Sequence, residues 1–377
     1  MKGLRLRRHG VRLLAALIGA LSLGAAATAR AQAPQQAPGV RVDADGTVHA
    51  PAMVVPASSL LSAEGKAYLA EHLQQMQRPD LLRQRGGVPI FMEGYLARQR
   101  ALFAVDKSDT TIGGVHVYDY TPAAGISRRN RHRVLINLHG GGFIGCFPGC
   151  AELESMPLAA LGAIRVVAID YRQGPDHRFP AASEDVAAVY RELLKTYSAR
   201  DIGIYGCSAG GMLTAMSIAW LQAHDLPRPG AAGIFCAGAG MSSAGFGGDA
   251  DYFTAPIGES RPPPPWPRAD APSPGARMPY FQGADLNDPL VSPLVSDAVL
   301  RQFPPTLVIT ATRGFELSSA VYTHTQLVRL GVDADLHVWE GMFHGFFYNP
   351  DVPESRQAYD VMLRFFDSRL GRRQGRR

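Results

Sequence analysis

The chain has 377 residues, of which 46% are hydrophobic and 19% are charged, a composition that buries a sizeable core and excludes an intrinsically disordered protein. The formal net charge is +5, but residues 1–31 hold six basic and no acidic residues, so the rest of the chain carries 5 − 6 = −1. This balance does not indicate a nucleic-acid partner, and we expect none.

The first segment has the three-part layout of a secretory signal peptide. A basic start is followed by an apolar run from Val11 to Ala27 and by the small-x-small pattern Ala29-Arg30-Ala31. Because the run is short for a membrane span, we expect a leader cleaved after residues 1–31, with no stable span afterwards. The mature protein is then expected to be periplasmic or secreted. The sequence does not fix the oligomeric state and leaves a homodimer open.

A linker rich in Ala, Pro and Gln is expected over residues 32–56, a folded domain over 57–370 and a basic tail over 371–377. Helical spacing predicts a helix from Leu60 to Gln77, with Ser62 as a candidate N-cap. A second helical stretch is predicted from Val88 to Leu102. These helices, at about 60–102, precede the main alternating pattern.

From about residue 110, short apolar runs alternate with helical patterns. Strands are predicted at residues 115–120, 134–138, 164–169, 202–205, 231–236, 306–310 and 334–339. Helices are predicted at residues 182–197, 209–224, 316–330 and 354–370. This order predicts an α/β fold whose central sheet is mainly parallel, with helices on both faces. The Gly- and Pro-rich segment at about 244–288 excludes a central strand or a regular helix and is either a surface excursion or a lid.

A glycine-flanked serine follows the predicted strand at 202–205. In Gly206-Cys207-Ser208-Ala209-Gly210 the serine would lie on a sharp turn between a strand and a helix, with its hydroxyl exposed at the carboxyl edge of the sheet. Glycines two residues before and after the serine relieve the crowding of such a turn. The pattern predicts Ser208 as a nucleophile, against the alternative that it only caps the following helix.

Three glycines follow His139 directly after the strand at 134–138. Such a run allows backbone N–H groups to approach a substrate oxygen. The N–H groups of Gly141 and Gly142, together with that of Ala209, are therefore candidates for an oxyanion hole. The segment lacks the residues of a phosphate-binding loop, and His139 is expected to shape the loop rather than to bind a metal.

His344 lies in the glycine-flanked loop 341–346, just past the last predicted strand. A histidine at this edge of the sheet can reach the turn serine and accept its proton, which makes it the candidate general base. Most other histidines, such as His72, lack a comparable context.

These motifs together resemble the hormone-sensitive-lipase-like family of α/β hydrolases. The resemblance covers about residues 85–370 and also includes Asp170-Tyr171-Arg172, Pro175-Asp176-His177, Phe179-Pro180-Ala181-Ala182, Asp288-Pro289 and Ser292-Pro293. It implies an α/β-hydrolase fold, carboxylesterase activity that is often directed at short acyl esters, no cofactor and an N-terminal helical cap. The helices predicted at about 60–102 fit that cap.

Two positions depart from the family pattern. The residue before the serine is usually Asp but is Cys207 here, and its side chain is expected to point inward, with a cysteine nucleophile as the rival interpretation. The family's triad acid is usually an Asp at the position that Gly314 occupies. Glu316 is the favoured substitute, with Asp288 and Glu340 as weaker candidates, and the alternative is that Glu316 only opens the next helix.

The sequence therefore predicts a serine hydrolase that cleaves a carboxylic ester of a small molecule through an acyl-serine intermediate, with Ser208, His344 and Glu316 as its triad. An amide, lactone or carbamate hydrolase with the same site stays open, as does a ligand-binding relative without catalysis. No cofactor or metal is expected. Four cysteines allow three full disulfide pairings, among which the sequence does not choose: Cys146, Cys150, Cys207 and Cys236.

Overall fold

The computed structural model describes residues 39–50, 54–240, 248–259 and 278–371, and the chain divides into two units, residues 1–54 and 55–377. The expected leader lies outside the described residues, as do residues 372–377 of the basic tail and residues 244–247 and 260–277 of the Gly- and Pro-rich segment. In the first unit, where a linker is predicted, β1 (Arg41–Val42) pairs antiparallel with β2 (Val48–His49).

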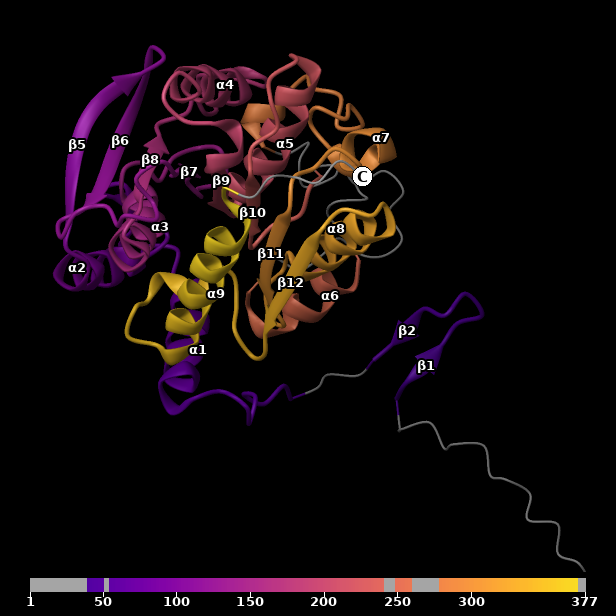
Figure 1. Cartoon of the computed structure of the whole chain (residues 1–377). Coiled ribbons are helices and arrows are strands. Elements are labelled where there is room, and N and C mark those ends of the chain that lie inside the picture. Colours follow the sequence, from indigo (N-terminus) through magenta and orange to yellow (C-terminus); the bar gives the residue numbers. More distant parts are fainter. Residues whose placement is uncertain (1–38, 51–53, 241–247, 260–277, 372–377) are drawn as a thin grey trace, which may run out of the picture. The chain divides into compact units, whose positions relative to one another are not determined.

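An eight-stranded sheet forms the centre of the second unit (Figure 1). Its strands, in pairing order, are β12 (Ala334–Trp339), β11 (Thr306–Ala311), β10 (Ala231–Phe235), β9 (Ile202–Cys207), β7 (Val134–Leu138), β8 (Arg165–Ile169), β6 (Val115–Pro122) and β5 (Val105–Ile112). The strands from β12 to β8 are parallel, whereas β6 and β5 extend the sheet antiparallel. The prediction of a mainly parallel sheet is confirmed, and β5 is an edge strand that the sequence interpretation missed.

Helices cover both faces of this sheet. Side chains alternate along each strand, so each face contributes to its own core and is covered by its own set of helices. On β7, Leu135 packs in one core and Ile136 in the other. The first core receives side chains from α1 (Ala63–Met76), α2 (Glu93–Leu102), α3 (Gly149–Gly162) and α9 (Pro353–Arg369). The second receives them from α4 (Ala181–Leu193), α5 (Ala209–Ala223) and α8 (Leu317–Arg329).

Helices α1 and α2 lie where the N-terminal cap is predicted, but α2 begins at Glu93 rather than at Val88. Val88 and Pro89 instead form β4, which pairs with β3 (Gln84–Arg85). Pro89 has no backbone N–H to donate, which disfavours it inside a helix. Ser62 is the N-cap of α1, and its hydroxyl accepts a hydrogen bond from the N–H of Gly65 at 2.8 Å.

Part of the Gly- and Pro-rich segment is helical, so the prediction that it holds no regular helix is wrong for a few residues. Helix α6 spans Asp249–Thr254 and is followed by the 3₁₀ turn Ala255–Ile257. The N–H of Ala250 donates to the hydroxyl of Ser318 on α8 at 2.9 Å, which attaches α6 to the sheet-covering helices. The short helix α7 (Asp297–Leu300) follows before β11.

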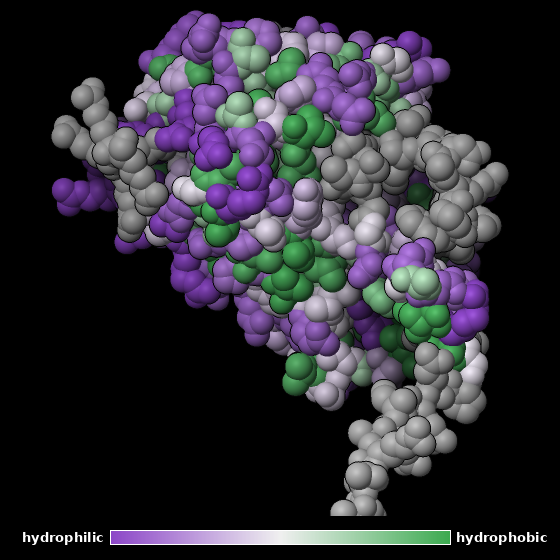
Figure 2. All heavy atoms as spheres, turned by 90° about the vertical axis from the view of Figure 1, so that its right-hand side faces the viewer, coloured by the Kyte–Doolittle hydropathy of each residue, from purple (hydrophilic) through white to green (hydrophobic). Residues whose placement is uncertain are grey.

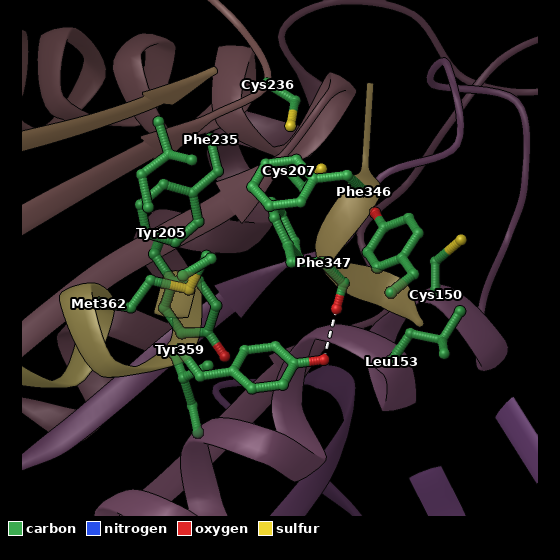
Figure 3. Close-up of a cluster of buried hydrophobic side chains, with 14 of the residues drawn as sticks. Cys150, Leu153, Tyr205, Cys207, Phe235, Cys236, Phe346, Phe347, Tyr359 and Met362 are labelled. Carbon is green, nitrogen blue, oxygen red and sulfur yellow. Dashed lines mark hydrogen bonds between the residues drawn. The ribbon is translucent and has the colours of Figure 1, made fainter. Parts of the chain in front are cut away.

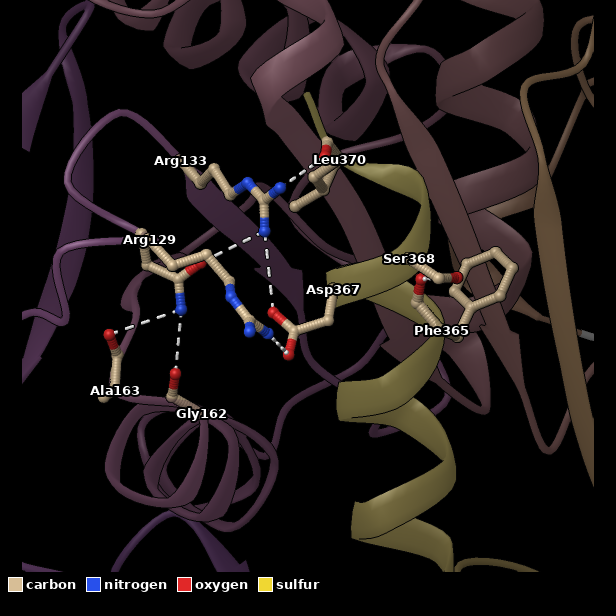
Figure 4. A network of polar contacts seen from close by, with 9 residues as sticks. Arg129, Arg133, Gly162, Ala163, Phe365, Asp367, Ser368 and Leu370 are labelled. Carbon is tan, nitrogen blue, oxygen red and sulfur yellow. Dashed lines mark hydrogen bonds and ion pairs between the residues drawn. The ribbon is translucent and has the colours of Figure 1, made fainter. Parts of the chain in front are cut away.

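The end of α9 is held by a network of polar contacts with the segment before β7 (Figure 4). Arg133 donates to the carbonyl of Leu370 at 2.6 Å and lies 3.5 Å from the carboxylate of Asp367, which Arg129 also contacts at 2.6 Å. The N–H of Gly371 donates to the carbonyl of Arg200 at 3.0 Å. These contacts fix the last turn of the helix against the sheet.

The core around β9 and β10 brings side chains of α9 together with those of the 3₁₀ turn Phe346–Tyr348, just after His344 (Figure 3). The hydroxyl of Tyr359 on α9 donates to the carbonyl of Phe347.

Hydrophilic residues cover most of the face on the side of α8, with small hydrophobic patches between them (Figure 2). No helix in the described ranges is both long and apolar enough to cross a membrane.

Candidate active site

Ser208 occupies a strained turn between β9 and α5. Its backbone has φ 58° and ψ −123°, a conformation that residues other than glycine rarely adopt. Its N–H donates to the carbonyl of Phe235 at 2.8 Å. A Cβ at Gly210 would lie 1.7 Å from the carbonyl oxygen of Leu138, so only glycine lets the turn pack against the end of β7. Cys207 and Ala209 are buried, whereas Ser208 is partly exposed. The local backbone thus turns the serine outward.

The glycine run after β7 leaves two N–H groups beside this turn. Gly141 has φ +123°, and a Cβ there would lie 2.2 Å from the carbonyl oxygen of Gly145, so the loop closes on itself only with glycine. Among the described residues, the N–H groups of Gly141, Gly142 and Ala209 have no protein acceptor. Donors left without a partner at a partly open site can bind a developing negative charge.

His139 is buried and shapes this loop, as the sequence predicts. Its ring stacks on Tyr171 at 4.5 Å, its Nδ1 lies 2.6 Å from the carbonyl oxygen of Gly140, and its own carbonyl accepts from the Tyr171 hydroxyl at 2.6 Å. Burial lowers the pKa of His139 to about 4, so its ring is neutral at pH 7. A neutral imidazole whose Nδ1–H donates to Gly140 accounts for the contact without a metal.

His344 and Glu316 lie within hydrogen-bonding distance of each other. His344 Nδ1 is 2.9 Å from Glu316 Oε2, and Glu316 Oε1 accepts from the hydroxyl of Thr310 at 3.0 Å. Glu316 is only 1% exposed. Burial alone would lower the pKa of His344, but the Glu316 carboxylate outweighs this effect and raises that pKa to about 9. The carboxylate therefore favours the protonated ring, as the acid of a catalytic triad does.

The serine turn and the histidine loop are both attached to the end of β10. Ser208 donates through its N–H to Phe235, and the N–H of Gly345 lies 3.3 Å from the sulfur of Cys236. No hydrogen bond joins the Ser208 hydroxyl to His344 in the described part of the chain. In proteins without bound substrate such catalytic hydrogen bonds are often long, so their absence does not remove either residue as a candidate.

The other candidates of the sequence analysis lie elsewhere or are inaccessible. Asp288 accepts from the N–H of Leu290 at 2.8 Å within its own turn, and Glu340 is exposed. Cys207 is fully buried, and burial raises the pKa of its thiol well above the ordinary value. A buried neutral thiol is a poor nucleophile, which leaves Ser208 as the exposed candidate.

Two buried carboxylates near the site were not predicted. Glu259 accepts from the N–H of His344 at 3.1 Å and lies 2.6 Å from Nε2 of His72, whose ring stacks on Phe343 at 3.7 Å. Glu154, on α3, accepts from residues of the glycine run and of the serine turn. Both partnerships join segments far apart in the chain, and local patterns give no signal for them.

The cysteines divide into one disulfide and two thiols. Cys146 and Cys150 are bonded, whereas Cys207 and Cys236 are free and buried. One group in the described residues could hold a cation, since one ligand atom each from Cys236, Glu316 and His344 lie within 4.8 Å of one another. Two of these three residues are the candidate acid and base, so the group belongs to the same site.

Comparisons with known proteins show the family to which the chain belongs. The family model for the alpha/beta hydrolase fold matches residues 135–348, more than half of the chain. An acetyl-hydrolase of Streptomyces hygroscopicus is 29% identical over 64% of this chain and 78% of its own length. The carboxylesterase/phospholipase LipF of Mycobacterium tuberculosis is 29% identical over 60% of this chain, which spans only 59% of that relative.

Solved structures give the same result. The crystal structure of esterase E25 is 30% identical, covers 85% of this chain and 98% of its own, and has a TM-score of 0.70. An esterase from the bacterial hormone-sensitive lipase family is 26% identical, covers 81% of this chain and 99% of its own, and has a TM-score of 0.65.

Proposed function

Because the chain belongs to the α/β-hydrolase family and is a carboxylesterase-type serine hydrolase, we propose that Ser208, His344 and Glu316 form its catalytic triad. The observation that carries the proposal is the 2.9 Å contact between His344 and a buried carboxylate. The loop of His344 and the strained turn of Ser208 are both attached to the end of β10. The substrate would be a small carboxylic ester with a short acyl group.

In this mechanism, neutral His344 accepts the proton of the Ser208 hydroxyl as its oxygen attacks the ester carbonyl. The carbonyl oxygen becomes an oxyanion that receives hydrogen bonds from the N–H groups of Gly141, Gly142 and Ala209. His344 then protonates the departing alcohol, which leaves an acyl group on Ser208. Water, deprotonated by the same histidine, hydrolyses the acyl-enzyme.

Glu316 orients the ring of His344 and stabilises its protonated form. Its contact with Nδ1 fixes the tautomer so that Nε2 is free to exchange a proton with the serine. Thr310 holds the second carboxylate oxygen, which keeps the acid in place while the histidine changes charge.

The direct experiment is hydrolysis of p-nitrophenyl acetate and butyrate by the mature chain and by Ser208→Ala. Ser217→Ala is the matched control, since Ser217 lies on the helix that Ser208 precedes, is buried and has no hydrogen-bond partner for its hydroxyl among the described residues. We expect activity in the parent and the control and its loss in Ser208→Ala. Equal activity in all three would remove Ser208 as the nucleophile.

Two further measurements address the alternatives. A fluorophosphonate probe labels only an activated serine, so labelling of Ser208 would argue against a ligand-binding relative without catalysis. Matched ester, amide, lactone and carbamate substrates of the same acyl group would rank the leaving groups, and we expect the ester to have the highest kcat/KM.

The proposed location is the periplasm or the outside of the cell. The leader pattern over residues 1–31 supports it, and so does the disulfide between Cys146 and Cys150, because disulfides persist in oxidising compartments. N-terminal sequencing of the exported protein, expected to begin near residue 32, tests this proposal. Sedimentation of the same sample distinguishes a monomer from a homodimer.

A further inference from the structure

Glu154 is a buried carboxylate for which the mechanism above has no role. It lies on α3, is 3% exposed and forms no contact with a basic side chain among the described residues. Four groups donate to its two oxygens: the Asn137 side-chain amide at 2.9 Å, the Gly140 N–H at 2.8 Å, the Tyr348 hydroxyl at 2.9 Å and the Cys207 N–H at 3.2 Å.

Three of these donors lie in or next to the segments of the candidate active site, and the fourth, Asn137, lies on β7 just before the glycine run. Gly140 directly precedes the glycines of the oxyanion hole, and Cys207 directly precedes the nucleophile. Tyr348 follows the candidate base by four residues. A single side chain from α3 therefore contacts the glycine run, the serine turn and the histidine loop at once.

The contacts also indicate the charge state that they require. Two backbone N–H groups and an amide NH₂ can only donate, so they need a carboxylate that accepts at both oxygens. Burial raises the pKa of Glu154 to about 7, while the four hydrogen bonds act in the opposite direction and favour the ionised form. A neutral isostere could not satisfy all four donors.

We propose that Glu154 is a positioning residue for ester hydrolysis: its carboxylate holds the oxyanion-hole loop and the nucleophile turn at a fixed spacing. The proposal rests on the function proposed above. A loop displaced by a fraction of an ångström weakens hydrogen bonds that form only in the transition state, and this lowers kcat more than it raises KM.

The test compares Glu154→Gln with Glu152→Gln. Glu152 lies two residues earlier on the same helix and is also 3% exposed, but its carboxylate pairs with Arg100 at 2.7 Å and Lys107 at 3.0 Å, away from the active-site segments. With p-nitrophenyl butyrate we expect Glu154→Gln to lower kcat about 100-fold, within the range for loss of one oxyanion-hole donor. Its KM should change by less than about threefold.

The affinity for a trifluoromethyl ketone provides a second measurement, because the serine oxygen adds to this ketone and gives a tetrahedral adduct that carries an oxyanion. This affinity should fall in parallel with kcat in Glu154→Gln and stay at the parent value in Glu152→Gln. Urea unfolding of both variants measures their stability, and the kinetics are compared at a temperature at which both proteins are folded. Reduced kcat in Glu154→Gln alone therefore separates positioning from a general loss of stability.

Equal kcat in the two variants would overturn the proposal. If Glu154→Gln does not fold by circular dichroism, Tyr348→Phe decides, because it removes one donor and keeps the buried ring. We expect that variant to lower kcat about tenfold, and an unchanged kcat would overturn the proposal. A parent protein that neither cleaves esters nor reacts with fluorophosphonate would refute the proposed function instead, which keeps the two failures distinct.

Discussion

The carboxylate of Glu316 fills the space in which a side chain at position 314 would begin. A Cβ built on Gly314 would lie 2.5 Å from Glu316 Oε1 and 2.8 Å from Oε2. The hormone-sensitive-lipase-like family usually has an Asp at this position, and the proposed triad acid of this chain lies two residues further on. The missing side chain at 314 is what makes room for it.

Gly314→Ala should therefore impair catalysis although it adds only one methyl group. The new Cβ would push the Glu316 carboxylate away from His344, and we expect kcat to fall at least tenfold. Gly94→Ala on α2 is the control, because a Cβ there meets no atom within 4 Å. Steady-state kinetics on p-nitrophenyl butyrate measure both, and a Gly314→Ala enzyme as active as Gly94→Ala would contradict the relationship.

Glu316→Ala should lower kcat by about 10³ to 10⁴, since loss of the triad acid leaves the histidine without orientation or charge stabilisation. The double variant Gly314→Asp, Glu316→Ala places a carboxylate at the family position and frees the space that Glu316 occupies. We expect it to regain at least tenfold in kcat over Glu316→Ala. Single-turnover rates with p-nitrophenyl acetate compare Glu316→Ala with the double variant. Equal rates would show that a carboxylate at position 314 does not replace that of Glu316.

The pH dependence of kcat/KM should report the raised pKa of His344. Only the neutral ring accepts the serine proton, so activity should rise with pH until about 9. In Glu316→Gln the carboxylate that raises the pKa is gone, and the midpoint should move to lower pH. Rates of Ser208→Ala at each pH supply the background hydrolysis. A parent midpoint near 6.5, the ordinary pKa of histidine, would contradict the assignment.

The same pKa has a consequence for stability. Because the pKa of folded His344 lies above that of the unfolded chain, the His344–Glu316 pair stabilises the fold fully below pH 6.5. This contribution is lost as pH rises from 6.5 through about 9. Urea unfolding of the parent and of Glu316→Gln across this range should show the difference in unfolding free energy shrinking with pH.

Glu259→Gln should impair the histidine loop. The carboxylate accepts from the N–H of His344 and pairs with His72, so the variant weakens both contacts, and we expect about a tenfold lower kcat and a lower Tm. Glu64→Gln, exposed on the same helix as His72, is the control. If kcat and Tm match those of the control, the contact with His344 has no role in catalysis.

Cys207→Ala should remain active, because the thiol is fully buried whereas Ser208, the proposed nucleophile, is partly exposed. The smaller side chain leaves a small void in the core, so we expect the free energy of unfolding to fall by about 1 kcal/mol. Esterase assays and urea denaturation measure the two effects. Loss of activity in a folded Cys207→Ala protein would favour the rival interpretation, in which Cys207 is the nucleophile.

Buried strands and the residues that end them could be predicted from sequence because each carries a local pattern. The apolar runs of β7 and β9, followed by glycines, correctly predicted that the glycine run and the Ser208 turn follow adjacent strands at one edge of the sheet. Strand β5 was missed because its polar residues are mostly exposed at the sheet edge and show no alternation. Helix α3 was missed because it is buried over most of its length and contains Pro157, so it lacks an apolar stripe.

The supporting carboxylates could not be predicted for a different reason. Glu154 lies on the missed helix α3, and Glu259 lies in a segment whose composition indicated a surface excursion or a lid without singling out any residue. Their contacts join them to residues 53 and 85 positions away in sequence, Cys207 and His344. Glu316 could be proposed as the acid from the sequence because it lies close to the position where the family usually has its Asp.

The polar contacts between the end of α9 and the segment before β7 indicate how far the chain must extend to keep the fold. A truncated protein that ended at Phe366 would lose the Asp367 carboxylate and the Leu370 carbonyl, and Arg133 would be left partly buried without either partner. One that ended at Gly371 would retain every contact of that network. Affinity tags and fusion partners therefore belong beyond residue 371, and shorter expression boundaries are expected to yield insoluble protein.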